Sequence, residues 1–120
     1  MPAFEELIRR YGLRRFDPET RRDLTLRQDG KITFLGGVFV VCCHERSEAD
    51  SITCIQAGYS ATLLTVLQAY ERQDWRQVCD GQIMFYVSTS IERAQWMQVA
   101  SEIAEHCVIK TAIRPDFRAS

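Results

Sequence analysis

Residues 24–43 read LTLRQDGKITFLGGVFVVCC, and this stretch decides the fold of the 120-residue chain. Its apolar and β-branched runs are interrupted by Asp-Gly at 29–30 and by Gly-Gly at 36–37. Such pairs are typical of the tight turns of β-hairpins. The stretch therefore predicts a meander of three antiparallel strands.

The register of the first hairpin is predicted from its hydrophobic pattern. A two-residue loop at 29–30 would place Leu26 opposite Thr33 and mix the two faces. A three-residue loop at 28–30 pairs Leu26 with Ile32. A two-residue turn at 36–37 then pairs Phe34 with Phe39 and Ile32 with Val41, which continues that face into the next strand. The predicted core face then carries Leu24, Leu26, Ile32, Phe34, Phe39, Val41 and Cys43.

The opposite face of this meander is also half apolar, through Leu35, Val38 and Val40. A large exposed apolar face is uncommon on a monomer. We therefore expect a cover, which would be a helix of the chain itself, a second subunit or a bound segment.

Helical spacing of apolar residues predicts a first helix over residues 3–11, with Gly12 in position to end it. β-branched residues predict a fourth strand over residues 52–55. A helix from residue 52 is an alternative there, because the 3.6-residue period of a second helix over 61–73 extends back to Ile55.

Residues 83–87 are apolar on both sides and predict a central strand. Thr89 and Glu92 match a capping box and predict the start of a third helix. Its apolar face would carry Trp96, Val99, Ala100, Ile103 and Cys107. The predicted fold class is α+β, a single domain over 1–120 with an antiparallel sheet and three helices in the order α-β-β-β-(β)-α-β-α.

Composition excludes several classes of protein. Apolar residues at 46% and charged residues at 26% are ordinary for a globular chain, and no apolar run is long enough for a membrane helix. A net charge of −1 gives no general attraction to nucleic acid or to anionic lipid. We interpret the early arginines as a solvated face rather than a nucleic-acid patch: Arg9, Arg10, Arg14, Arg15, Arg21, Arg22 and Arg27.

The five cysteines are an odd number and include an adjacent pair, which is a poor disulfide framework. The N-terminus resembles neither a secretory signal nor an anchor. We therefore expect buried free thiols in a protein of the reducing cytoplasm.

The same cysteines offer two kinds of chemistry that the spacing does not favour. Cys42, Cys43, His44 and Cys54 lack the paired hooks of a zinc site. A thiol nucleophile with His44 or His106 would need a context that lowers the thiol pKa. We expect no catalytic residue, no metal and no cofactor, with a small thiol or histidine enzyme as an open alternative.

The layout resembles the small chaperones of bacterial type III secretion. The resemblance is carried by residues 11–13, 24–34, 38–43, 52–58 and 63–69. It implies an α+β homodimer that works without ATP and holds the N-terminal part of a secreted effector in an extended form. A heterodimer is a variant of this expectation, and neither nucleic acid nor membrane is an expected partner.

Two sets of site residues follow as hypotheses from pattern. Contact with the secreted protein is assigned to the first helix and the outer sheet face: Phe4, Leu7, Tyr11, Leu35, Val38 and Val40. Dimerisation is assigned to the second helix and the segment after it: Leu64, Tyr70 and Trp75. The alternative function is a regulatory or inhibitor protein, of the kind mobile elements encode, that binds a folded target.

Overall fold

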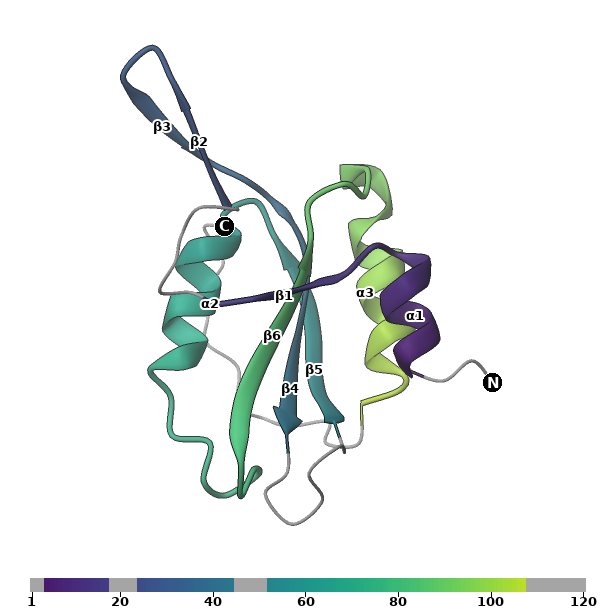
Figure 1. The fold of residues 1–120 in the computed structure, drawn as a ribbon. Helices are drawn as coiled ribbons and strands as arrows, with labels where there is room; N and C mark the ends of the chain where they lie inside the picture. Colours follow the sequence, from purple (N-terminus) through teal and green to yellow (C-terminus); the bar gives the residue numbers. More distant parts are fainter. Residues whose placement is uncertain (1–3, 18–23, 45–51, 108–120) are drawn as a thin grey trace.

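A computed structural model describes residues 4–17, 24–44 and 52–107 of the chain (Figure 1). The fold is α+β with an antiparallel sheet and three helices, as predicted, but five strands precede the second helix where the sequence indicated at most four, because the short strand Arg14–Phe16 was not predicted. They are α1 (Phe4–Arg10), β1 (Arg14–Phe16), β2 (Thr25–Gln28), β3 (Lys31–Phe34), β4 (Gly37–His44), β5 (Ile52–Ser60), α2 (Leu63–Glu71), β6 (Gln82–Ser88) and α3 (Trp96–Ala104).

Four of the strands form one antiparallel sheet in the order β1-β6-β4-β5. The prediction that residues 83–87 form a central strand is confirmed, because β6 lies between β1 and β4. Strands β1 and β5 are the two edges, and no other described strand pairs with their outer sides.

Helices cover both faces of this sheet. Helix α2 packs on the face that carries Phe39 and Val41, whereas α1 and α3 pack on the face that carries Val38 and Val40 (Figure 1). Alternate residues of β4 point to opposite faces, so a strand that is apolar throughout can serve two cores. The result is a three-layer arrangement with one hydrophobic core on each side of the sheet.

The first hairpin differs from its predicted register and position. Leu26 lies opposite Thr33 and Arg27 opposite Ile32, so the loop has two residues, Asp29 and Gly30. Both loop residues have positive φ, 54° and 75°, as a type I′ turn requires. Strands β2 and β3 pair only with each other among the described residues, and the predicted pairing of Phe34 with Phe39 and of Ile32 with Val41 is wrong.

The β2–β3 hairpin therefore leaves the core face that the sequence suggested. Figure 1 shows it projecting beyond the sandwich. Leu26, Ile32 and Phe34 are 49%, 54% and 45% exposed, whereas Leu24 at the base is buried beside Phe39 and Val41. The prediction that these three residues lie in the core is therefore wrong.

Residues 52–55 belong to a strand, as predicted, and the strand continues to Ser60. A bulge in its pairing with β4 places Val41 opposite Gln56 but Cys42 opposite Cys54. The extra residue lets Gln56 face α2 while Cys54 faces α3. Gly58 lies opposite Phe39, where an added Cβ would come within 2.7 Å of the phenyl ring, and this close approach explains the glycine in a strand.

The predicted helices are confirmed, with one change at the start of α3. Gly12, at φ +63°, follows α1 as expected. The predicted start at Thr89 is wrong, since a short 3-10 turn at Arg93–Gln95 precedes Trp96 and no side chain caps it. The Trp96 indole donates to the Ile91 carbonyl at 2.9 Å and closes this turn. The predicted apolar face of α3 packs against the sheet.

The expectation of free thiols is wrong for four of the five cysteines. Disulfides join Cys43 to Cys79 on one face of the sheet and Cys54 to Cys107 on the other. Cys42 is a free, buried thiol. The pairs come together through tertiary contacts over 36 and 53 residues, which the parity and spacing of cysteines along the chain did not indicate.

Candidate functional site

The residues predicted to contact a partner lie mainly inside the molecule. Val38, Val40 and Leu7 are fully buried between the sheet, α1 and α3. The chain's own helices thus cover the apolar outer face, which was one of the covers expected. These three side chains are therefore not exposed for a partner to contact. Phe4, Tyr11 and Leu35 are partly buried, and their contact with a partner stays a prediction.

The residues predicted to form a dimer are also core residues. Leu64, Tyr70 and Trp75 are buried beneath α2. The Trp75 indole donates to the Tyr70 carbonyl at 2.7 Å, and the two rings stack with centroids 5.9 Å apart. Dimerisation through these side chains is therefore corrected, because their surfaces are already used within the chain.

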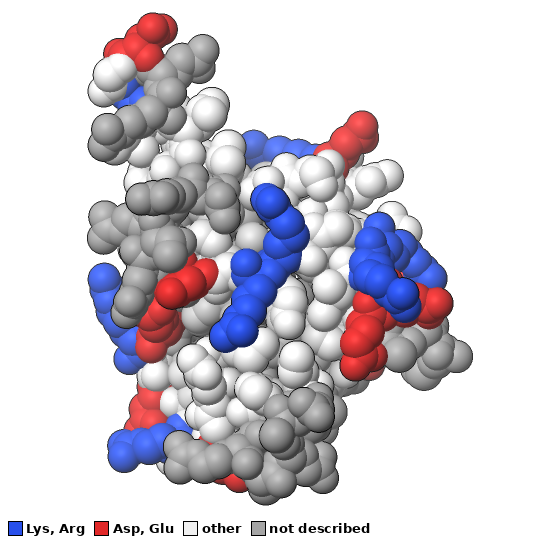
Figure 2. Space-filling model, in the orientation of Figure 1, with Lys and Arg blue, Asp and Glu red and all other residues white. Residues whose placement is uncertain are grey.

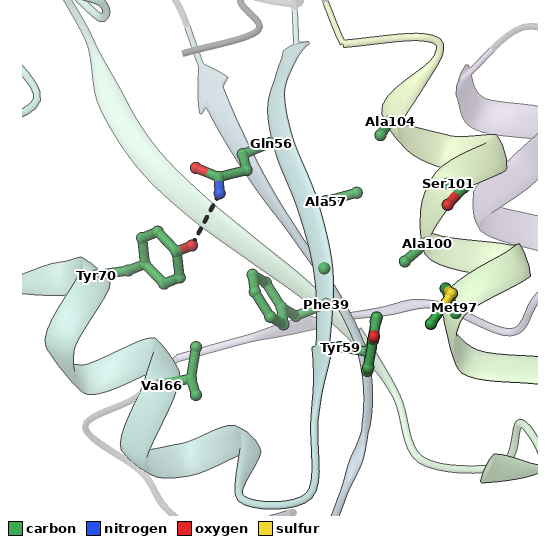
Figure 3. Close-up of a pocket in the computed structure, with 11 residues that line it drawn as sticks. Phe39, Gln56, Ala57, Tyr59, Val66, Tyr70, Met97, Ala100, Ser101 and Ala104 are labelled. Atoms are coloured by element: carbon green, nitrogen blue, oxygen red, sulfur yellow. Dashed lines mark hydrogen bonds between the residues drawn. The ribbon is translucent and has the colours of Figure 1, made fainter. Parts of the chain in front are cut away.

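An open groove lies instead along the outer edge of β5. It has a volume of about 350 Å³ and runs between α2 and α3, with the β5 backbone as its floor (Figure 3). We call it the β5 groove. The sequence prediction missed it because the order of strands in a sheet is set by tertiary pairing, which local patterns do not reveal.

The wall on the α2 side is formed by Phe39, Gln56, Gly58, Val66 and Tyr70. Gln56 donates from Nε2 to the Tyr70 hydroxyl at 2.9 Å. Its Oε1 is buried and has no hydrogen-bond partner among the described residues. A buried acceptor without a partner costs free energy. This side of the groove therefore has aromatic side chains that are almost fully buried and one buried amide that is incompletely satisfied.

The wall on the α3 side is formed by Ala57, Tyr59, Met97, Ala100, Ser101 and Ala104. Three of the four α3 residues are short, which keeps the helix surface low beside the strand (Figure 3). Met97 is 63% exposed, and the Tyr59 ring lies 6.5 Å from that of Trp96. Exposed methionine and aromatic side chains suit contact with varied apolar groups.

The floor of the groove has the chemistry of an unprotected strand. β5 is nine residues long and contains neither proline nor a charged residue. The outer side of an edge strand presents unpaired N–H and C=O groups that can pair with another chain. The signal in the sequence was present, as an uncharged run from Ile52 to Ser60, but its place at an edge was not.

The thiol chemistry considered from sequence has little support in the described residues. Burial raises the pKa of the Cys42 thiol to about 12, so it stays protonated at neutral pH. The other four cysteines are disulfide-bonded. Within residues 4–17, 24–44 and 52–107 no group of histidine, cysteine and carboxylate side chains is arranged to hold a metal ion.

Comparisons of the chain with protein-family models, with curated proteins and with solved structures found no match. None of the helices described is both long and apolar enough to cross a membrane. Function must therefore be inferred from the β5 groove and its chemistry.

Proposed function

We propose that this chain binds an extended segment of a partner polypeptide along β5. One observation carries the proposal: a nine-residue edge strand without charge or proline forms the floor of an open groove between two helices. A segment in the groove would add a fifth strand to the sheet, with affinity from backbone hydrogen bonds and specificity from alternate side chains.

Each wall of the groove would contact one face of the bound segment. Side chains of a bound strand alternate between faces, so one set would lie beside Gln56 and Gly58 and the other beside Met97 and Ala104. The preferred partner is therefore an extended apolar segment without proline at the pairing positions.

Within this function, the best-fitting role is that of a secretion chaperone that keeps the N-terminal part of an effector extended. The type III chaperone resemblance and the open strand edge support the same mode of binding. Chaperones of that kind are homodimers, and we include a dimer in the proposal, formed through residues other than Leu64, Tyr70 and Trp75, which are buried.

A cytoplasmic location belongs to the same proposal, and the two disulfides weigh against it, because disulfides persist in oxidising compartments. Alkylation of the thiols under denaturing conditions, applied directly to whole cells so that buried thiols react before disulfides exchange, is followed by mass spectrometry and decides this point. Five alkylated cysteines would support the cytoplasm, and alkylation of Cys42 alone would place the protein in an oxidising compartment.

The binding proposal is tested with peptides selected from a random library displayed on phage. Ser101 is exposed and lines the groove, so Ser101→Arg should obstruct it without disturbing the core. Gln98→Arg adds the same side chain to an exposed position of α3 outside the groove and is the matched control.

We expect Ser101→Arg to weaken the selected peptides at least about tenfold, a loss of about 1.4 kcal/mol, and Gln98→Arg to leave affinity unchanged. Equal affinity for both variants would contradict binding in the β5 groove. An inhibitor of a folded target predicts instead that linear peptides are not selected and that the captured partner keeps its native hydrogen-exchange protection.

A further inference from the structure

The β2–β3 hairpin is the most exposed apolar feature of the described chain. Leu26, Ile32 and Phe34 are each about half exposed, and the hairpin projects away from the sandwich (Figure 1). A two-stranded hairpin is at best marginally stable in water unless a third strand or a packing surface supports it. Neither is present among the described residues, since β2 and β3 pair only with each other.

The register of the hairpin shows what kind of partner fits it. Arg27 is paired with Ile32 and Thr25 with Phe34, so Ile32 and Phe34 share one face, whereas Leu26 and Thr33 lie on the other. A folded surface or a helix would cover one face only. A strand added along the edge of the hairpin has side chains on both faces and would cover apolar residues on both.

The base of the hairpin lies at one end of the β5 groove. The Leu35 carbonyl accepts a hydrogen bond of 3.1 Å from the Leu63 amide, at the start of α2. A Cβ added to Gly36 would lie within 2.9 Å of the Ser60 carbonyl and within 2.5 Å of the Trp96 ring. A segment that leaves the groove at Ser60 therefore arrives where the hairpin begins.

We propose that the β2–β3 hairpin is a second binding surface for the same extended polypeptide that occupies the β5 groove. The segment runs past Ser60 and pairs with one edge of the hairpin as a third strand. Its side chains then lie beside apolar side chains on both faces of the hairpin. This inference rests on the proposed function and extends it, because it assigns a longer partner segment with a second apolar stretch beyond the groove.

The length of the partner segment follows from the strands it would pair with. Strand β5 has nine residues and each hairpin strand has four. At about 3.3 Å per residue, a segment of about 9 residues fills the groove and about 4 more pair with a hairpin strand. A segment of about 18 residues leaves about 5 for the passage between the two.

The test measures fluorescence anisotropy of two labelled peptides, one of about 9 residues selected on the groove and one of about 18 residues that extends it with alternating valine and serine. The variants are Ile32→Ser with Phe34→Ser in one chain, and Ser101→Arg as the groove control. Both hairpin positions are exposed, so the paired substitution should leave the melting temperature of the sandwich unchanged.

We expect the longer peptide to bind the unchanged protein at least about tenfold more tightly than the shorter one, and the hairpin variant to remove that gain. The shorter peptide should bind the hairpin variant as before. Equal binding of both peptides to the unchanged protein would overturn the hairpin proposal while the groove proposal stands. Binding of neither peptide would overturn both.

Light scattering tests the remaining alternative, in which a second copy of this chain binds the hairpin. A dimer that dissociates when Ile32 and Phe34 become serine would show that the hairpin pairs with its counterpart, and would overturn the proposal. An unchanged mass for the variant, together with the lost gain for the longer peptide, supports it.

Discussion

The two edges of the central sheet differ in length and in charge. β1 has three residues and exposes Arg14 and Arg15, and Figure 2 shows basic side chains across the middle of the face that carries β1. β5 has nine residues and no charge. Natural sheets protect their edges with short strands and charged side chains. The comparison teaches that, within the part of the chain that the structure describes, one edge is protected and the other is left open between two helices.

The largest expected effect comes from the disulfide that ties the open edge to its helical wall. Cys54 in β5 is bonded to Cys107, just after α3, across 53 residues. Replacing both with alanine should lower the free energy of unfolding by about 4 kcal/mol, because the unfolded chain regains its freedom. Urea unfolding measures this loss.

The second disulfide is the matched control for that edge. Cys43 and Cys79, across 36 residues, join the inner strand β4 to the segment after α2. Their replacement with alanine should also cost about 4 kcal/mol, yet only loss of Cys54–Cys107 should speed hydrogen exchange in β5. Faster β5 exchange in both double variants would show that the bond does not act locally on the open edge.

A smaller effect is expected where the open edge comes closest to the core. Gly58→Ala places a Cβ about 2.7 Å from the Phe39 ring, which also packs 5.5 Å from the Tyr70 ring. We expect a loss of about 1–3 kcal/mol in the free energy of unfolding, from overpacking. Thermal unfolding would measure it.

The cause can be tested by coupling. In a Phe39→Leu background the added methyl group has room, so Gly58→Ala should cost clearly less. The same loss of stability in both backgrounds would mean that Gly58 is needed for its backbone conformation and not for the space it leaves to the Phe39 ring.

The open edge also differs in carrying a buried amide, that of Gln56, whose hydrogen bonds are incompletely satisfied. Tyr70→Phe removes the hydroxyl that accepts from Gln56 and should cost about 1 kcal/mol. Gln56→Leu removes the donor and the unpartnered acceptor together and should cost less. A larger loss for Gln56→Leu in chemical denaturation would contradict this description of the α2 wall.

How far the sequence could predict this fold depends on how local each feature is. Gly12, the apolar strand at 83–87 and the face of α3 from Trp96 to Cys107 were correct, because each follows from neighbouring residues. The hairpin register was wrong because a continuous core face was assumed. The turn chemistry of Asp29 and Gly30 decided the register instead.

The candidate site was harder to predict, for a physical reason. Alternation identified Val38 and Val40 as one apolar face, but it could not show that α1 and α3 cover this face. The open edge of β5 depends on which strands pair with β4, over distances of many residues. Likewise, Leu64, Tyr70 and Trp75 formed an apolar pattern whose surface is used in the core and not in a dimer.

The smallest expected effect concerns the wall of the groove at α3. Tyr11, just after α1, donates from its hydroxyl to Glu102 of α3, and Arg10 pairs with the same carboxylate at 3.1 Å. The hydrogen bond to Glu102, with some burial, raises the pKa of Tyr11 above its usual 10.0. Because the folded state holds this proton more tightly, its contribution to stability is complete below pH 10 and is lost as pH rises through the raised pKa.

Tyr11→Phe removes that contribution and is the comparison variant. Thermal unfolding between pH 8 and 11 should show that the unchanged protein loses more stability than the variant above about pH 10. Parallel curves for the two proteins would mean that the Tyr11–Glu102 contact does not help to hold α1 on α3.

Hydrogen exchange of the peptide complex, read by mass spectrometry, tests the central claim most directly. With a selected peptide bound, we predict slower amide exchange across β5, Ile52–Ser60, and unchanged exchange across β1, Arg14–Phe16. Slower exchange at β1 with β5 unchanged would contradict the account, because the peptide would then bind the protected edge and not the open one.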